Sequence, residues 1–151
     1  MISTPTSLED ATLTITQETR VKAPLSITFA ALLEQLGPGN DKPDGTAMPM
    51  TLEAFPGGRW FRDLGQGNGH FWGHVQAIKS PSLLEISGPL FMSAPVANNV
   101  QYRLTEDHGE TVIHFRHTGF GLVPKEVASH IHEGWSHICE QARRHAEAAN
   151  A

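Results

Sequence analysis

The sequence predicts an α+β domain in which a curved antiparallel sheet of about six or seven strands wraps around a long C-terminal helix. Three observations predict this fold. A strand and a short helix open the chain, a series of short strand-like segments follows, and one amphipathic helix closes it. The 151 residues suffice for one hydrophobic core and are too few for two substantial ones. We therefore expect residues 11–151 to form a single domain, preceded by a flexible polar leader at residues 1–10.

The first two elements are a strand and a helix. Residues 11–21 are rich in Thr, Ile and Val in a period-two pattern, which predicts a strand, and Pro24 ends it because it has no backbone N–H. Residues 25–36 form the predicted helix, with Ser26 as the expected N-cap. Its apolar face is expected to consist of residues spaced i, i+3, i+4 and i+7: Phe29, Leu32, Leu33 and Leu36.

The middle of the chain consists of short strands and turns. Residues 37–49 contain several Pro, Gly and Asp and are expected to form a long loop. Strands are then predicted at 50–55, 59–64, 70–79, 83–87, 100–105 and 110–118, with Gly-rich or polar turns between them. The apolar segment 88–98 contains two prolines. Three of its residues are expected to form a lid, a plug at one end of the sheet or a contact with a second subunit: Phe91, Met92 and Val96.

The last predicted element is a helix over residues 124–148. Pro124 suits a first helical turn. A continuous apolar stripe follows at steps of four, four, three and four residues, and it is expected to face the concave side of the sheet: Val127, Ile131, Trp135, Ile138 and Ala142.

Composition excludes several classes of function. The formal net charge of −5 argues against nucleic-acid binding. No run of about eighteen apolar residues occurs, so no membrane span is expected, and the N-terminus has no signal-peptide pattern. Cys139 is the single cysteine, which excludes an internal disulfide and makes a reducing, cytoplasmic location the simplest expectation.

The nine histidines suggest a metal site, but their spacing does not. No pair lies where one strand or helix could chelate an ion, because the pairs are either too far apart or on different faces. A site assembled from separate elements, such as His74, His117 and His132, stays open. No metal and no cofactor are predicted, because scattered surface and pocket-rim histidines are the better explanation.

Catalytic motifs are equally scarce. Neither Gly-x-Ser-x-Gly nor His-Glu-x-x-His occurs in the sequence. The run of glycines at 65–69 precedes a predicted strand rather than a helix, so it is interpreted as a hairpin turn and not as a phosphate loop.

Several short motifs, in order along residues 11–148, resemble a known family. They are Val21-Lys22-Ala23-Pro24, Pro56-Gly57-Gly58-Arg59-Trp60, Gly73-His74-Val75, His117-Thr118-Gly119-Phe120 and His132-Glu133-Gly134-Trp135. The sequence is similar to START-like (SRPBCC, helix-grip) domains, and within them to homologues of the activator of the ninety-kilodalton heat-shock protein ATPase. The resemblance implies a helix-grip fold with a cavity between sheet and C-terminal helix. Members bind lipids or polyketides, act as aromatase/cyclases or serve as co-chaperone domains.

The expected function is binding of a small hydrophobic or aromatic molecule in that cavity. The alternatives are a cyclase- or hydrolase-like enzyme that uses His117 and Tyr102 for acid–base chemistry, and a co-chaperone that acts on a heat-shock-protein ATPase. A homodimer formed through an edge strand or through 88–98 is a further possibility. Strand parity places Tyr102, Phe115 and His117 toward the helix. Trp72 and His74 are expected to share a face, and a bulge near Gly73 could reverse the assignment of that face. The candidate pocket residues are Trp60, Arg62, Trp72, His74, Phe91, Tyr102, Phe115, His117, Ile131, His132 and Trp135.

Overall fold

A computed structural model describes residues 7–151 of the chain. The leader expected at residues 1–10 lies partly outside the described residues, and its end forms one short helical turn. The elements in chain order are η1 (Glu9–Ala11), β1 (Thr12–Val21), α1 (Leu25–Leu36), β2 (Thr51–Leu52), β3 (Arg59–Gly65), β4 (Asn68–Lys79), β5 (Leu83–Gly88), β6 (Val96–Asp107), β7 (Glu110–Gly121), α2 (Lys125–Ala128) and α3 (Ile131–Asn150).

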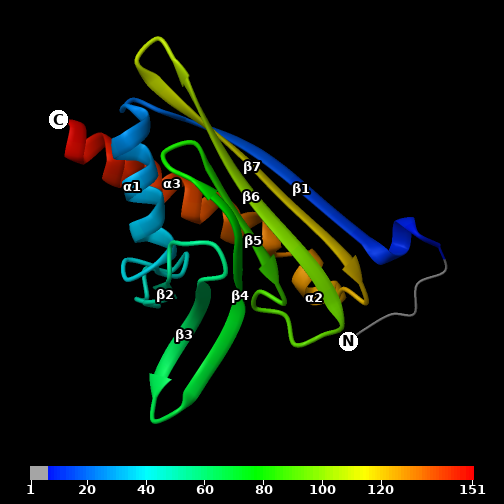
Figure 1. The fold of residues 1–151 in the computed structure, drawn as a ribbon. Helices are drawn as coiled ribbons and strands as arrows, with labels where there is room; N and C mark the ends of the chain where they lie inside the picture. The colour runs from blue at the N-terminus through cyan, green and yellow to red at the C-terminus, as the bar shows by residue number, and fades with distance from the viewer. Residues whose placement is uncertain (1–6) are drawn as a thin grey trace.

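All seven strands form one antiparallel sheet in the order β1-β7-β6-β5-β4-β3-β2 (Figure 1). From β2 to β7 each strand pairs with the next along the chain, and β1 pairs with β7 at the opposite edge. The helices α1 and α3 pack against each other, and α3 runs behind the curved strands in the view of Figure 1. The predicted α+β fold is confirmed.

The opening strand and helix agree with the sequence prediction except at the cap. The residues of β1 alternate between exposed and half-buried, and α1 has the predicted bounds. The prediction of Ser26 as N-cap is wrong, because the helix begins one residue earlier, at Leu25. The capping position belongs to Pro24, whose carbonyl accepts a hydrogen bond from the Thr28 N–H at 3.0 Å.

The strand predicted at 50–55 is wrong in length, since β2 contains two residues. The chain leaves the strand at Glu53, whose carboxylate accepts hydrogen bonds from the backbone N–H and the guanidinium Nε of Arg59 at 2.8 and 2.9 Å. The Phe55 N–H donates to the Glu53 carbonyl at 2.8 Å, so the turn into β3 starts within the segment predicted as a strand.

The prediction of one uninterrupted C-terminal helix over 124–148 is also wrong, because the helix is interrupted after Ala128. Ser129 and His130 form a turn, in which the His130 N–H donates to the Val127 carbonyl at 3.1 Å, and α3 begins at Ile131. The Ser129 hydroxyl donates to the Glu126 carbonyl at 3.0 Å and so competes with the helical hydrogen bonds. The apolar stripe therefore divides: Val127 is half-buried on α2, whereas the rest of the stripe is buried on α3.

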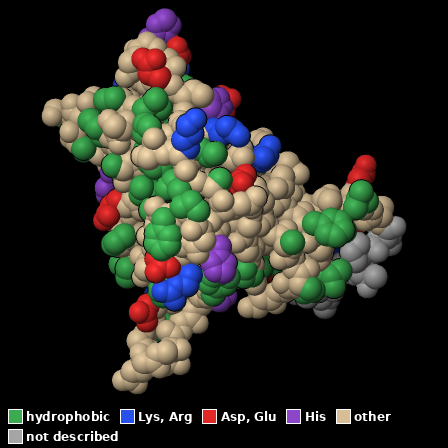
Figure 2. Space-filling model, in the orientation of Figure 1, with side chains coloured by type: hydrophobic (Ala, Val, Ile, Leu, Met, Phe, Trp, Pro, Cys, Tyr) green, Lys and Arg blue, Asp and Glu red, His purple; other side chains and the backbone are tan. Residues whose placement is uncertain are grey.

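A β-bulge in β4 changes which side chains of the strand face the core. Trp60 pairs with Gly73 and Phe61 pairs with Phe71, which leaves Trp72 as the extra residue. Trp72, at the bulge, is buried, and His74, two residues further along the strand, is exposed. In a regular strand these two side chains would share a face, and the bulge puts them on opposite ones. The far end of this β3–β4 hairpin projects from the body as a narrow tip of backbone and uncharged polar side chains (Figures 1 and 2).

The segment 88–98 belongs to the core rather than to a separate lid. Leu90 and Met92 are 0 and 3% exposed, Val96 is buried at the first position of β6, and Phe91 is half-buried. This corresponds to the plug among the three alternatives for the segment. Among residues 7–151, none of the helices has the length and apolar character needed to cross a bilayer.

Candidate functional site

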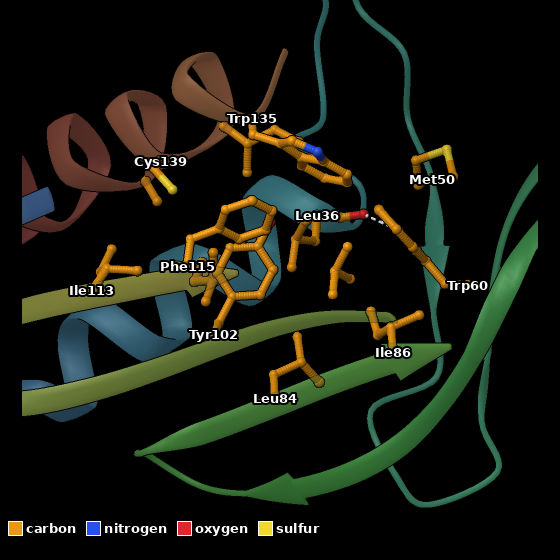
Figure 3. Packing of buried hydrophobic residues seen from close by; sticks show 14 of the residues in the cluster. Leu36, Met50, Trp60, Leu84, Ile86, Tyr102, Ile113, Phe115, Trp135 and Cys139 are labelled. Atoms are coloured by element: carbon orange, nitrogen blue, oxygen red, sulfur yellow. Dashed lines mark hydrogen bonds between the residues drawn. The ribbon is translucent and has the colours of Figure 1, made fainter. Parts of the chain in front are cut away.

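A continuous group of aromatic side chains fills the space between the sheet and α3. Trp60 meets Trp72 edge-to-face at 4.9 Å between ring centroids, and Phe91 lies 5.7 Å from Trp72 and 6.3 Å from Trp135. On the other side Trp135 lies 4.9 Å from Phe115, which lies 4.9 Å from Tyr102 (Figure 3). The centre of the fold is thus occupied by side chains and not by a cavity.

Trp60 also ties the sheet to α1. Its indole Nε1–H donates to the Leu36 carbonyl at the end of α1, at 2.7 Å (Figure 3). Because this carbonyl has no partner within the helix, the bond satisfies a helix terminus inside the core. Trp60 is fully buried, and its role is structural.

His117 is a buried residue with both ring nitrogens engaged. The Trp135 Nε1–H donates to Nδ1 at 3.1 Å, so the proton is on Nε2, which donates to the Asn98 Oδ1 at 2.7 Å. Burial lowers the pKa of His117 to about 4, so the ring is neutral at pH 7. The Asn98 amide in turn donates to the Pro89 carbonyl at 3.3 Å.

Tyr102 and Cys139 are buried behind this network. The Tyr102 hydroxyl has no hydrogen-bond partner among the described residues, and burial raises its pKa well above the usual value, with a smaller contribution from Cys139. Burial raises the pKa of the Cys139 thiol to about 12, so the sulfur is unreactive.

The pocket with the most apolar lining opens beside the filled core, where the 37–49 loop meets α2 and α3. It has a volume of about 340 Å³. Apolar side chains from five parts of the chain form its walls: Met48, Trp72, Phe91, Val127, Ile131, Trp135 and Ile138. The gap between α2 and α3 places His130 at its margin, and Gly134 leaves open space on the facing turn of α3.

One polar cluster lies at the edge of this pocket and fastens the loop to the helices. The Asp41 carboxylate accepts hydrogen bonds from His137 Nε2 at 2.7 Å, Gln35 Nε2 at 2.9 Å and Gln141 Nε2 at 3.2 Å. Burial alone would raise the pKa of Asp41, but the hydrogen bonds from His137 and Gln35 outweigh burial and lower it. Asp41 is therefore ionised and held by residues of both α1 and α3.

Four of the eleven sequence-predicted pocket residues line this pocket: Trp72, Phe91, Ile131 and Trp135. Four others lie deeper in the core, next to the pocket wall or behind it: Trp60, Tyr102, Phe115 and His117. The remaining three lie elsewhere. His74 is exposed beside Phe71 on the outer face, His132 is exposed on α3, and Arg62 is half-buried in a shallow groove along the β3–β4 hairpin.

Sequence reasoning missed the polar side of the pocket. Asn40 and Asp41 were included only in a loop, and His137 was treated as one of several scattered histidines. The i, i+4 spacing of His137 and Gln141 was a usable signal, because it places both side chains on one face of α3. Their partner Asp41 could not be found in this way, since it lies 96 residues from His137 along the chain.

The comparisons with known proteins identify a family. The family model described as activator of Hsp90 ATPase homolog 1-like protein matches residues 25–147. A search of the curated proteins found no match.

Solved structures show the same fold at low sequence identity. CalU16 from Micromonospora echinospora is 17% identical with a TM-score of 0.62, over 88% of this chain and 75% of that one. A protein from Rhizobium leguminosarum is 16% identical with a TM-score of 0.67, over 90% and 95% of the two chains. The di-domain ARO/CYC protein StfQ from the steffimycin biosynthetic pathway is 11% identical with a TM-score of 0.64, over 93% of this chain and 51% of that one. At these identities the likeness establishes the helix-grip fold alone.

Proposed function

The chain belongs to the family of activator of Hsp90 ATPase homolog 1-like proteins, in the START-like superfamily, and from this premise we propose that it binds a small hydrophobic or aromatic molecule. The binding site is the pocket between the 37–49 loop, α2 and α3. The observation that carries the proposal is the lining of this pocket, which is apolar and aromatic except for a few polar groups at one edge.

The size and chemistry of the pocket support this function. Its volume of about 340 Å³ falls at the small end of the range typical of ligand sites, which combine apolar walls with a few placed polar groups. Trp72, Phe91 and Trp135 offer ring surfaces to an aromatic ligand. CalU16 and the ARO/CYC protein StfQ share the fold, which is consistent with such a ligand without identifying it.

The acid–base alternative gains no support from the geometry. Both nitrogens of His117 are engaged, and neither His117 nor Tyr102 lines the pocket. Co-chaperone action rests on the family name alone. The homodimer and the cytoplasmic location also stay predictions.

The proposal is tested by a thermal-shift screen with fatty acids, aromatic polyketides and sterols. A ligand at a hundred times its Kd stabilises the native state by about 2.7 kcal/mol. The variant Gly134→Leu should lose this response, because a side chain added at Gly134 enters open space at the pocket. It should keep its own stability, since Leu favours a helix more than Gly does.

Ala148→Leu is the matched control, because it adds a similar side chain at an exposed position of α3 that does not line the pocket. It should respond to ligand like the wild type. If no ligand class raises Tm, or if Gly134→Leu responds as strongly as the control, the proposed site is wrong.

A further inference from the structure

We propose that His137, held by Asp41, recognises the ligand by accepting a hydrogen bond from a hydroxyl or N–H group on a neutral molecule whose apolar body fills the pocket. This inference rests on the proposed function and adds the chemical class of the ligand. It is carried by the geometry of the polar edge, by an unpartnered amide in the same lining and by the charges around the pocket.

The geometry fixes which nitrogen of His137 is available. Because the Asp41 carboxylate takes the Nε2–H at 2.7 Å, the neutral ring has its lone pair on Nδ1. Nδ1 has no partner among the described residues, although the side chain lines the pocket. His137 Nδ1 can therefore accept a hydrogen bond from a ligand group that donates one.

Fastening the loop does not by itself explain a histidine at this position. Asp41 also accepts hydrogen bonds from Gln35 and Gln141, one on each carboxylate oxygen. The carboxylate would therefore keep two donors without His137. Its contact with His137 also orients the ring, in the way that a carboxylate commonly orients an imidazole that must accept a proton or a hydrogen bond.

A second polar group in the pocket lining lacks a partner. Asn40 is 2% exposed, lines the same pocket, and its Nδ2 makes no hydrogen bond within residues 7–151. A buried amide donor without a partner costs about 1–3 kcal/mol, which a ligand acceptor would offset. The pocket lining therefore contains an acceptor, His137 Nδ1, and a buried amide donor that has no protein partner, Asn40 Nδ2.

The charges in the lining favour a neutral ligand over an anion. At the polar edge, the ionised Asp41 carboxylate lies 2.7 Å from Nε2 of His137. An anionic ligand would add a further negative charge next to an apolar surface, where charges are poorly solvated. The ligand class is thus a neutral, aromatic or apolar molecule with a hydroxyl or N–H donor.

Three naphthalene probes that differ at one substituent test the inference. 2-Naphthol is neutral at pH 7 and donates a hydrogen bond, 2-methoxynaphthalene has the same rings without a donor, and 2-naphthoate is an anion. Binding to the whole chain is measured by calorimetry or by tryptophan fluorescence. We expect 2-naphthol to bind about five- to tenfold more tightly than the methyl ether, the gain typical of one hydrogen bond.

The variant His137→Phe should abolish this preference, so that 2-naphthol and 2-methoxynaphthalene bind to it with affinities within about twofold of each other. The matched control is His132→Phe, on the same helix but exposed and outside the pocket lining, and it should keep the preference. Because His137→Phe removes a tie to the loop, histidine ¹⁵N NMR of the wild type provides a second readout. The His137 Nδ1 signal should move with 2-naphthol and not with the ether.

The outcomes separate the two proposals. Equal binding of 2-naphthol and 2-methoxynaphthalene, with both lost in Gly134→Leu, overturns the role of His137 and leaves the pocket intact. Tightest binding of 2-naphthoate also overturns it, because His137 would then act as a charged donor. Absence of binding by all three probes counts against the pocket itself and overturns both.

Discussion

At the scale of single residues, His117 shows how a titratable side chain becomes part of a core. Trp135 and Asn98 occupy its two nitrogens, and the bond from Trp135 to Nδ1 requires the neutral ring. A second proton would point Nδ1–H at the Trp135 N–H, two donors facing each other. Burial and the contact with Trp135 therefore disfavour protonation of His117 in the native state.

The protonation of His117 should therefore make the stability fall in mild acid. Its pKa is lowered from 6.5 to about 4 in the native state, so between these values the unfolded chain binds a proton that the native state does not. The free energy of unfolding should fall by about 3 kcal/mol from pH 7 to pH 4 through this residue, and no further below pH 4.

Urea unfolding of the wild type and of His117→Phe across this range measures the effect. The variant is less stable at pH 7, because Asn98 loses its partner, but its stability should depend less on pH by about 3 kcal/mol. If the stability of the two proteins instead changes in parallel with pH, the pKa of His117 is not lowered in the native state.

Which residues face inward could be predicted where the strands are regular. In β6 and β7, alternation correctly placed Tyr102, Phe115 and His117 toward the helix, because these strands pair without interruption from Val96 to Asp107. It could not place His74, because one extra residue in β4 reverses the side chains that follow it, up to a second register shift between Val75 and Ala77. The sequence alone showed that a bulge near Gly73 was possible, and only the packing of Trp72 into the core decides it.

At the scale of elements, the bulge in β4 depends on two backbones that nearly touch. A Cβ added at Gly88 of β5 would lie 2.5 Å from the Gly73 Cα and 2.5 Å from the Trp72 carbonyl oxygen. Both obstacles are backbone, so no side chain can move aside. The bulge that turns Trp72 toward the pocket therefore requires glycine on the neighbouring strand.

This close approach predicts opposite effects for two Gly→Ala changes. Gly88→Ala should destabilise by about 1–3 kcal/mol, the usual cost of overpacking. Gly134→Ala should stabilise by roughly 0.5–1 kcal/mol, because its Cβ meets nothing within 4 Å and Ala favours the helix. Both values come from urea titrations at one pH. If Gly88→Ala left the free energy of unfolding unchanged, β4 and β5 would be able to separate here at little cost.

At the scale of the whole molecule, the fold could be predicted more completely than the site. The order of strand, helix, meander and final helix restricts the topology, since consecutive antiparallel strands usually pair with each other. The pocket depends instead on where the 37–49 loop rests and on the interruption between α2 and α3. Both are set by long-range contacts, such as that between Asp41 and His137, which leave no periodic pattern in the sequence.

The nine histidines are distributed over the molecule, and this distribution predicts that zinc does not change the Tm. Within residues 7–151, no three His, Cys, Asp or Glu side chains are close enough to hold a metal ion. The residues named above as an example of a site assembled from separate elements lie far from one another: His74 on the outer face, His117 in the core and His132 on the exposed side of α3. A structural zinc site needs four converging ligands and would stabilise the fold strongly. One equivalent of zinc should therefore leave Tm unchanged, measured by calorimetry with and without a chelator. A stoichiometric rise in Tm would instead require ligands that the described structure does not bring together.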